Sequence, residues 1–251
     1  MTAKISENNF TTWEAYDDGT GQVFPADISF NFDSSLNSKA VLLFIAWRED
    51  EATFAGYSYS GSWTGLYELQ NNVTQNSIHI LVIYITNPGD GIFTINGAGP
   101  TPFQLRGVLG YYKLYNIDQY FLSPYINNLI TQGTGTSSGT LSARRVGNYN
   151  LIMDMCIATN TPTLAMTGDT RTQSFNSTSG FSADRLRFAS SYLLGNYDNT
   201  TDISWSISSS QDFIYVVVQV RGLYNYNVAD IFIAPNIVGA TEFKTADIYR
   251  H

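Results

Sequence analysis

The chain has 251 residues, of which 43% are hydrophobic and only 14% are charged, and its formal net charge is −8. This composition predicts a globular protein, and the length allows one large all-β domain or two small ones. The negative charge argues against nucleic acid and against an anionic membrane surface as partners, because both attract clusters of basic residues.

Strands are predicted from residue 23 onward, after a polar N-terminal segment. Residues 1–22 are mostly polar and end in Asp-Asp-Gly-Thr-Gly, so we expect an N-terminal arm and a turn. Residues 23–32 alternate in hydrophobicity like a half-buried strand, and residues 40–47 form a continuous apolar strand. Residues 78–95 are two apolar, β-branched runs around Asn-Pro-Gly-Asp-Gly, a pattern typical of a β-hairpin.

The pattern of strands recurs in the second half of the chain. Residues 117–140 include a Gly/Ser/Thr-rich stretch that predicts a flexible linker. Ile203 follows Phe93 by 110 residues, and Leu223-Tyr-Asn follows Leu114-Tyr-Asn by 109. An offset held over several strands indicates an internal duplication, although β-proteins share coarse patterns of this kind by chance. The matched segments are 40–47 with 149–158, 78–86 with 185–194, 92–95 with 202–207, and 103–116 with 213–225.

These elements predict an all-β chain without helices between the strands, which excludes a parallel α/β fold. Each half has an apolar face, and we expect the two faces to be buried against each other. The predicted architecture is a β-sandwich of jelly-roll type over residues 23–225, with half-repeats 23–116 and 141–225. The N-terminal arm (1–22) and a C-terminal arm (226–251) flank it.

The sequence contains no recognisable catalytic motif. Gly-x-Ser-x-Gly, the phosphate-binding loop and His-Glu-x-x-His are all missing. His79 lies within an apolar strand and His251 is the last residue, so neither is placed as a general base. Cys156, the only cysteine, lies in an apolar run and is predicted to be a buried thiol. We therefore predict a protein that is not an enzyme and that holds no metal or cofactor.

Two weaker alternatives concern acidic residues. Paired carboxylates could cleave glycosidic bonds, because their spacing is set in space and not in sequence. The turns at residues 17–21 and 87–91 could offer oxygen atoms to Ca²⁺. Charged and Asx-type turns explain both sets more simply. The candidate carboxylates are Glu14, Glu49, Asp50, Glu51 and Glu68.

One aromatic stretch is the best candidate for ligand binding. Tyr57, Tyr59, Trp63 and Tyr67 are separated by Gly, Ser and other small or polar residues. Aromatic rings stack on the apolar faces of sugars, and a sandwich can present them on a loop or an outer face. The alternative is that they belong to the core or to a subunit contact, since tyrosine is common in sheets.

The C-terminal segment is too apolar to be left exposed without cost. We expect residues 226–251 to pack on their own domain or on a neighbouring subunit. The N-terminus has no apolar core of a signal peptide, which predicts synthesis in a cytoplasm, and no apolar run is long enough to span a membrane. The predicted subunit-contact residues are Ile231, Phe232, Ile233, Ile237, Val238 and Phe243.

These features together resemble the jelly-roll modules of tailed-bacteriophage virions, of the capsid-decorating or the tail and receptor-binding type. The shared pattern is an apolar strand, a Gly/Ser-rich segment reading roughly Gly-Trp-Thr, a hydrophobic hairpin and a closing strand. Here these correspond to residues 41–47, 60–65, 78–95 and 107–115. The second half departs from it, because residues 166–170 lack the tryptophan. Bacterial surface modules and lectin-like modules share the pattern.

The resemblance implies a non-enzymatic structural protein, made in the host cytoplasm and located in the virion. Its partners would be other virion proteins or copies of itself. The resemblance also allows an adhesion module that binds a host surface glycan or receptor. A glycan-cleaving enzyme is the third reading.

Overall fold

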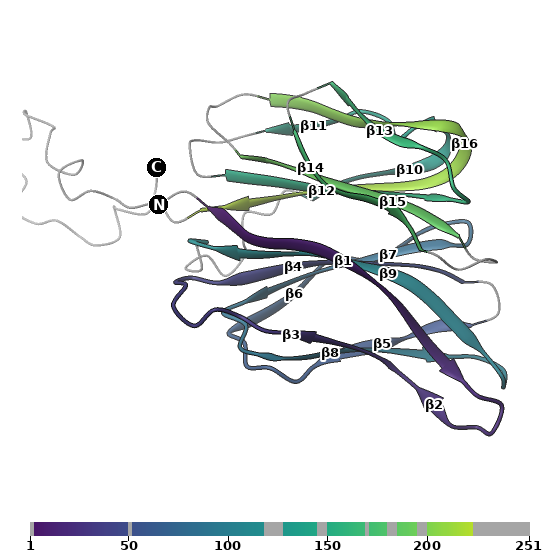
Figure 1. Ribbon diagram of the computed structural model, residues 1–251. Helices are drawn as coiled ribbons and strands as arrows, with labels where there is room; N and C mark the ends of the chain where they lie inside the picture. The colour runs from purple at the N-terminus through teal and green to yellow at the C-terminus, as the bar shows by residue number, and fades with distance from the viewer. Residues whose placement is uncertain are drawn as a thin grey trace, which may run out of the picture.

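The computed structural model describes residues 3–49, 52–117, 128–144, 150–168, 171–179, 185–194 and 200–222. All the regular secondary structure in these residues is β-strand, so the prediction of an all-β chain is confirmed for the described part (Figure 1). The same residues include no helix with the length and hydropathy needed to cross a membrane.

The first unit, residues 3–117, consists of two antiparallel sheets. A six-stranded sheet has the order β2-β1-β9-β4-β7-β6, and a three-stranded sheet with the order β3-β8-β5 covers one of its faces. The strands are β1 (Lys4–Asp17), β2 (Val23–Phe24), β3 (Ala26–Phe30), β4 (Ala40–Arg48), β5 (Thr53–Tyr59), β6 (Gly65–Gln75), β7 (Ile78–Thr86), β8 (Gly91–Ala98) and β9 (Gln104–Tyr115).

The second unit, residues 128–222, is a single curled sheet with the order β10-β16-β12-β15-β14. Its longest strand, β16, bends: the C-terminal half pairs with β10 and β12, and the N-terminal half pairs with β11 and β13 (Figure 1). The strands are β10 (Asn128–Ser137), β11 (Leu141–Arg144), β12 (Asn150–Thr159), β13 (Leu164–Gly168), β14 (Thr172–Thr178), β15 (Leu186–Leu194) and β16 (Thr200–Arg221).

The two units have the same strand order. In the first, β4 lies between β7 and β9, and β1 pairs with the outer side of β9. In the second, β12 lies between β15 and the C-terminal half of β16, and β10 pairs with the outer side of β16. The outer strands β3-β8-β5 correspond in the same way to β11, the N-terminal half of β16, and β13.

The six-stranded sheet is the middle layer of the molecule (Figure 1). One face of β4, including Leu42 and Phe44, packs against the second unit, and the other face, including Leu43 and Ile45, packs against β3, β5 and β8. Every residue of β7 is buried. Because side chains alternate between the faces of a strand, a sheet covered on both sides needs continuous apolar strands. The expectation of a single apolar face per half is therefore wrong for both units, since β12 likewise contributes Met155 to the core between the units and Cys156 to the core of the second unit.

Two segments that were expected to be irregular are strands. The predicted N-terminal arm (1–22) contains β1, which pairs with β9 from Lys4 opposite Tyr115 to Tyr16 opposite Gln104. The predicted linker (117–140) contains β10, which pairs with β16. Both strands lie on the outer flank of the strand they pair with, so many of their residues are exposed and polar. The predicted C-terminal arm (226–251) lies outside the described residues.

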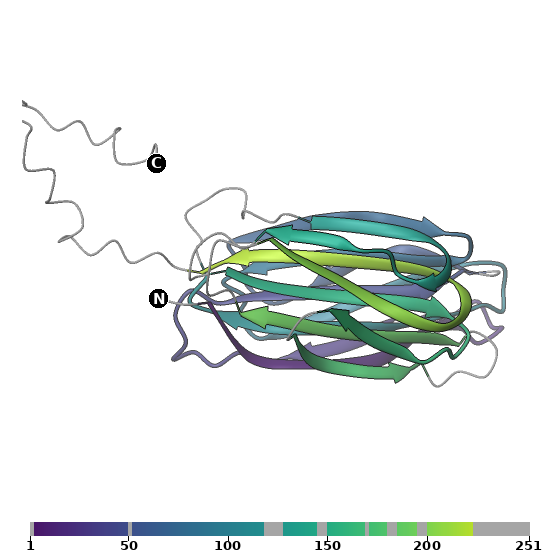
Figure 2. The same ribbon diagram turned by 90° about the horizontal axis from the view of Figure 1, so that it is seen from above.

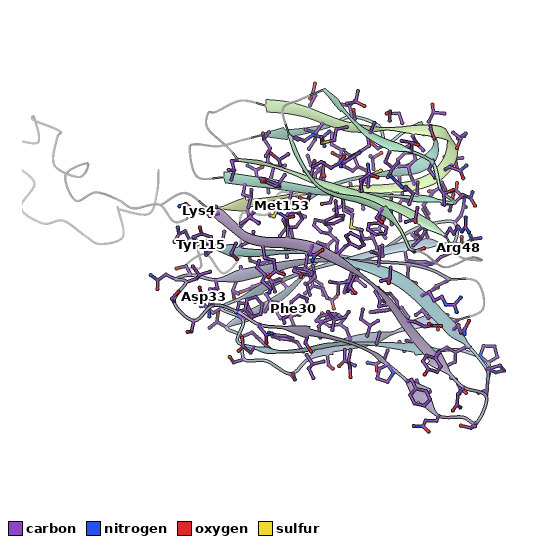
Figure 3. The ribbon with its side chains drawn as sticks, in the orientation of Figure 1. Lys4, Phe30, Asp33, Arg48, Tyr115 and Met153 are labelled. Carbon is purple, nitrogen blue, oxygen red and sulfur yellow. The ribbon has the colours of Figure 1, made fainter. Side chains whose placement is uncertain are left out.

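β1 begins and β16 ends at the same end of the molecule (Figure 2). Figure 3 shows Lys4, Asp33 and Tyr115 at this end and Arg48 at the opposite end. The loops of the first unit are therefore divided between two end faces, and the candidate sites lie on these faces.

Candidate functional site

The four aromatic residues predicted to bind a ligand do not share one face. Tyr57 and Tyr59, on β5, pack against the core under the three-stranded sheet, and the Tyr57 ring stacks on Phe93 with a centroid distance of 5.3 Å. Tyr67, on β6, packs against the core between the two units. Trp63 remains 50% exposed. Three of the four side chains therefore pack against a core, which was the alternative to ligand binding.

The hydroxyl groups of the two β5 tyrosines have partners inside the protein. Tyr57 donates to Glu68 Oε1 at 2.8 Å, and Tyr59 donates to the carbonyl oxygen of Gly89. Burial, with the negative charge of Glu68, raises the pKa of Tyr57 far above its usual value, and burial raises that of Tyr59 to about 12. Both phenols are therefore neutral anchors of β5.

Trp63 stands on a turn whose backbone is tied on both sides. Gly89 N–H donates to the Ser62 carbonyl oxygen at 2.8 Å, and Thr64 N–H donates to the Thr86 carbonyl oxygen at 2.9 Å. The turn between β5 and β6 is thus joined to the turn between β7 and β8. A large aromatic side chain on a braced turn, with half its surface in solvent, is suited to contact a partner.

The loop between β3 and β4 joins the same end face. Phe32 N–H donates to Asp90 Oδ1 at 2.7 Å, and Asn87 N–H donates to the Lys39 carbonyl oxygen at 2.8 Å. The turn that precedes β8 therefore holds the Trp63 turn on one side and the β3–β4 loop on the other.

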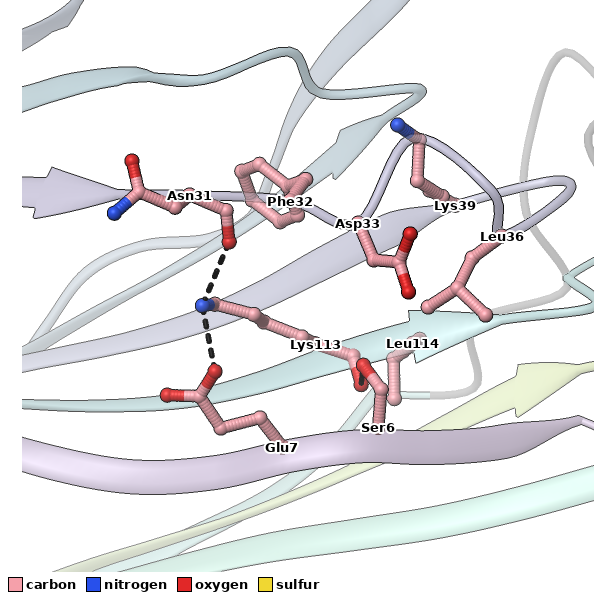
Figure 4. A pocket seen from close by; sticks show the side chains of 9 residues that line it. All are labelled: Ser6, Glu7, Asn31, Phe32, Asp33, Leu36, Lys39, Lys113 and Leu114. Carbon is pink, nitrogen blue, oxygen red and sulfur yellow. Dashed lines mark hydrogen bonds and ion pairs between the residues drawn. The ribbon is translucent and has the colours of Figure 1, made fainter.

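A cleft of about 320 Å³ lies between this loop and strands β1 and β9 (Figure 4). Lys113 crosses it: its ammonium group lies 2.6 Å from Glu7 Oε2, donates to the Asn31 carbonyl oxygen at 2.9 Å, and stands 5.5 Å from the Phe32 ring centroid (Figure 4). The lining residues are Ser6, Glu7, Asn31, Phe32, Asp33, Leu36, Lys39, Lys113 and Leu114.

The charges of this cleft balance. Burial alone would raise the pKa of Glu7, but hydrogen bonds from Lys113 and Tyr111 hold it below its usual value. Two carboxylates, Glu7 and Asp33, thus face two ammonium groups, Lys39 and Lys113. A cleft with balanced charges favours a neutral, hydroxyl-rich ligand over an ion, and its volume is at the small end for ligand sites.

At the opposite end, His79 lies in a polar cluster that sequence reasoning missed. Its side chain is buried, its Nδ1 lies 3.0 Å from Thr74 Oγ1, and its Nε2 lies 3.4 Å from Glu49 Oε2. Burial lowers the pKa of His79, and Glu49 opposes this effect. Trp47 stacks on the imidazole and donates its indole N–H to Glu49 Oε1 at 3.0 Å.

This Thr–His–Glu sequence of contacts has the order of a nucleophile, a base and an orienting acid. The cleft described above lies at the other end of the unit, and Glu49 Oε1 also accepts the Phe54 backbone N–H at 3.0 Å. The observed contacts therefore tie the ends of β4, β5 and β7 together.

A buried polar network surrounds Asp154, on β12. Its carboxylate accepts hydrogen bonds from Ser191 N at 2.6 Å, Tyr215 OH at 2.9 Å and Arg171 Nη1. Burial raises the pKa of Asp154, and the Arg171 guanidinium opposes this rise. Arg171 Nη2 donates to the Ser204 carbonyl oxygen at 2.7 Å. The only sequence signal was a carboxylate inside an otherwise apolar strand.

The remaining candidate groups have structural partners where they are described. Glu14 pairs with Arg106 at 3.0 Å, and the Asp17 carboxylate accepts the Gly19 N–H at 2.8 Å. Asp50 and Glu51 lie outside the described residues. Within the described ranges, no three His, Cys, Asp or Glu side chains are grouped to hold a metal ion. Cys156 is fully buried, as predicted.

The residues predicted to contact other subunits lie outside the described part of the chain. They are Ile231, Phe232, Ile233, Ile237, Val238 and Phe243.

Comparisons with known proteins place no constraint on these sites: no protein-family model, no curated protein and no solved structure matches the chain.

Proposed function

We propose that the chain is a non-enzymatic structural protein of a virion, either a capsid-decorating or a tail-associated component. In this proposal it packs on copies of itself or on other virion proteins. The observation that carries the proposal is the duplicated strand order, in which two equivalent units share one apolar core. Two units fused through a buried sheet make a rigid block, which is what a repeating assembly needs.

We also propose that each unit is a jelly roll. Apart from the two-residue β2, which pairs with β1, the strands pair from the two ends of the unit inward: β1 with β9, β3 with β8, and β4 with β7. β10, β11 and β12 make the corresponding pairs in the second unit. This is the pairing of one long hairpin rolled into two sheets, which supports the jelly-roll proposal. The departure is β6, which pairs with β7 and leaves the outer sheet with three strands.

Light scattering tests the structural proposal. The purified chain, of 27.9 kDa, is expected to have a mass in solution that is a multiple of this value. A variant that ends at residue 225 is expected to be monomeric, because the apolar residues of the C-terminal segment would provide the contact. Its circular dichroism and melting temperature should match those of the full chain, since the described cores involve no residue beyond 222.

A full chain that stays monomeric at all concentrations would contradict packing on copies of itself and would restrict the proposal to packing on other virion proteins. A truncated variant that assembles normally would contradict the role of the C-terminal segment.

The second candidate function is a carbohydrate-binding or receptor-binding module, which the half-exposed Trp63 favours. Replacing Trp63 by alanine is expected to weaken binding to a host surface polysaccharide about thirtyfold, because a central tryptophan carries about 2 kcal/mol or more. Isothermal titration with the polysaccharide measures this loss. Ile92, which is 41% exposed, provides the matched control in Ile92→Ala. Equal affinity of the Trp63→Ala variant and the parent chain would exclude this site.

A further inference from the structure

The outer side of β10 is an open sheet edge. β10 is the last strand of its sheet, and no described strand pairs with its outer side. From Asn128 to Gly135 its register with β16 is continuous. These eight residues, Asn-Leu-Ile-Thr-Gln-Gly-Thr-Gly, include no charged residue and no proline. Such an edge offers a regular row of backbone N–H and C=O groups to another strand.

The other long edges are protected. β6 has two breaks in its register with β7, and β14 has one break with β15. β1 occupies the position in the first unit that β10 occupies in the second, and it carries Lys4, Glu7 and Glu14. Bulges and charged side chains are the usual means of preventing edge-to-edge pairing. β10 has neither over residues 128–135.

A segment with strand character follows the last strand of the chain. Residues 228–234 read Val-Ala-Asp-Ile-Phe-Ile-Ala. β-Branched and aromatic residues predominate in it, as in strands that pair in sheets. Leu129 packs against the core of the second unit and Ile130 against the core between the units. A strand added beside β10 would extend both apolar layers, with Phe232 on one face and Ile231 and Ile233 on the other.

The length of the chain excludes antiparallel pairing within one molecule. Antiparallel to β10, residue 228 would lie beside Gly135, whose partner on β16 is Gln211. Arg221 is ten residues from Gln211 along the strand, about 34 Å. The seven steps from Arg221 to residue 228 reach at most about 25 Å. The segment could return to its own β10 only in the parallel direction, which is the less stable pairing.

We propose that residues 228–234 of one copy add to the outer edge of β10 of a second copy as an antiparallel strand. This inference rests on the proposed assembly and names the surface through which it forms. Backbone hydrogen bonds would give the affinity, and the alternate apolar side chains would give the register. The contact is head-to-tail, so it generates a ring or an open chain of copies.

Disulfide trapping between two variants, each with one cysteine added to the buried Cys156, tests this contact. Gln132, near the centre of the edge, is exposed. The Gln132→Cys variant is mixed under mild oxidation with Ile231→Cys and, separately, with Phe232→Cys, so that both faces of the added strand are sampled. We expect one mixture to yield a disulfide-linked dimer on a non-reducing gel. Thr12→Cys, at an exposed position of β1, is the matched control and should yield none with either partner.

A double variant, Gln132→Cys with Ile231→Cys in one chain, separates the two possible occupants. Disulfide-linked dimers and larger species support exchange between copies, whereas an internally cross-linked monomer would overturn it in favour of the chain's own segment. If light scattering shows an assembly but Gln132→Cys yields no dimer with either variant, the β10 contact is wrong and the proposed function stands. A chain that is monomeric by light scattering would overturn the β10 contact together with the self-assembly part of the proposed function.

Discussion

Replacing Arg171 by methionine is expected to lower the free energy of unfolding by about 3–5 kcal/mol, because it leaves the Asp154 carboxylate buried without its counter-charge. Both side chains are almost completely enclosed, with 1% of each exposed. The guanidinium also donates to the Ser204 carbonyl oxygen and faces the Trp205 ring, so its loss leaves an acceptor unsatisfied as well. Chemical denaturation followed by tryptophan fluorescence measures the effect.

A matched substitution at a more exposed ion pair shows how much of this loss of stability is due to burial. Arg106 pairs with Glu14 at 3.0 Å but closer to solvent, so Arg106→Met is expected to cost less than about 1 kcal/mol. Adding Asp154→Asn to Arg171→Met removes the buried charge and retains an oxygen acceptor for Ser191 and Tyr215. The double variant should therefore be more stable than Arg171→Met alone. Equal or lower stability of the double variant would show that the carboxylate is not the source of the loss.

The strands predicted correctly from sequence are those with the clearest burial. β4 and β7 lie between two other layers, so both of their faces are apolar and their continuous hydrophobic runs stand out. β1 and β10 were missed because each is paired on one flank for most of its length and carries polar residues on its exposed side. In β10, two glycines and three threonines have the composition of a linker, and only pairing with β16 makes the segment a strand.

The candidate site, too, could be predicted only in part from the sequence. The spacing of Tyr57, Tyr59 and Tyr67 places them near each other in sequence, but β5 belongs to the outer sheet and β6 to the middle sheet, so their side chains enter different cores. Nor does the sequence show that Asp154 meets Arg171, because that contact depends on how β12 lies against the residues that precede β14. Which residues share a face follows from strand periodicity, whereas which faces meet depends on the order of the sheets.

The contact between the two units depends on the absence of a side chain at Gly110, on β9. A β-carbon at this position would lie 2.6 Å from the ring of Phe175, on β14, which is closer than real contacts allow. Phe175 in turn packs against Phe10, with ring centroids 5.5 Å apart, and against Phe188 at 6.0 Å. The glycine therefore lets an aromatic side chain of the second unit enter the face of the first.

Gly110→Val is expected to destabilise the protein by about 1–3 kcal/mol, since the added side chain overpacks this contact. Phe175→Ala alone is expected to cost about 3–5 kcal/mol through the cavity it leaves. In the double variant the valine would occupy part of that cavity, so the loss should be smaller than the sum of the two, as measured by thermal or urea unfolding. Gly133→Val is the control, because a β-carbon there would meet Phe213 at an ordinary 3.6 Å. Strict additivity would mean that Gly110 and Phe175 do not act on each other, and that the two units are held together by the rest of their shared apolar face.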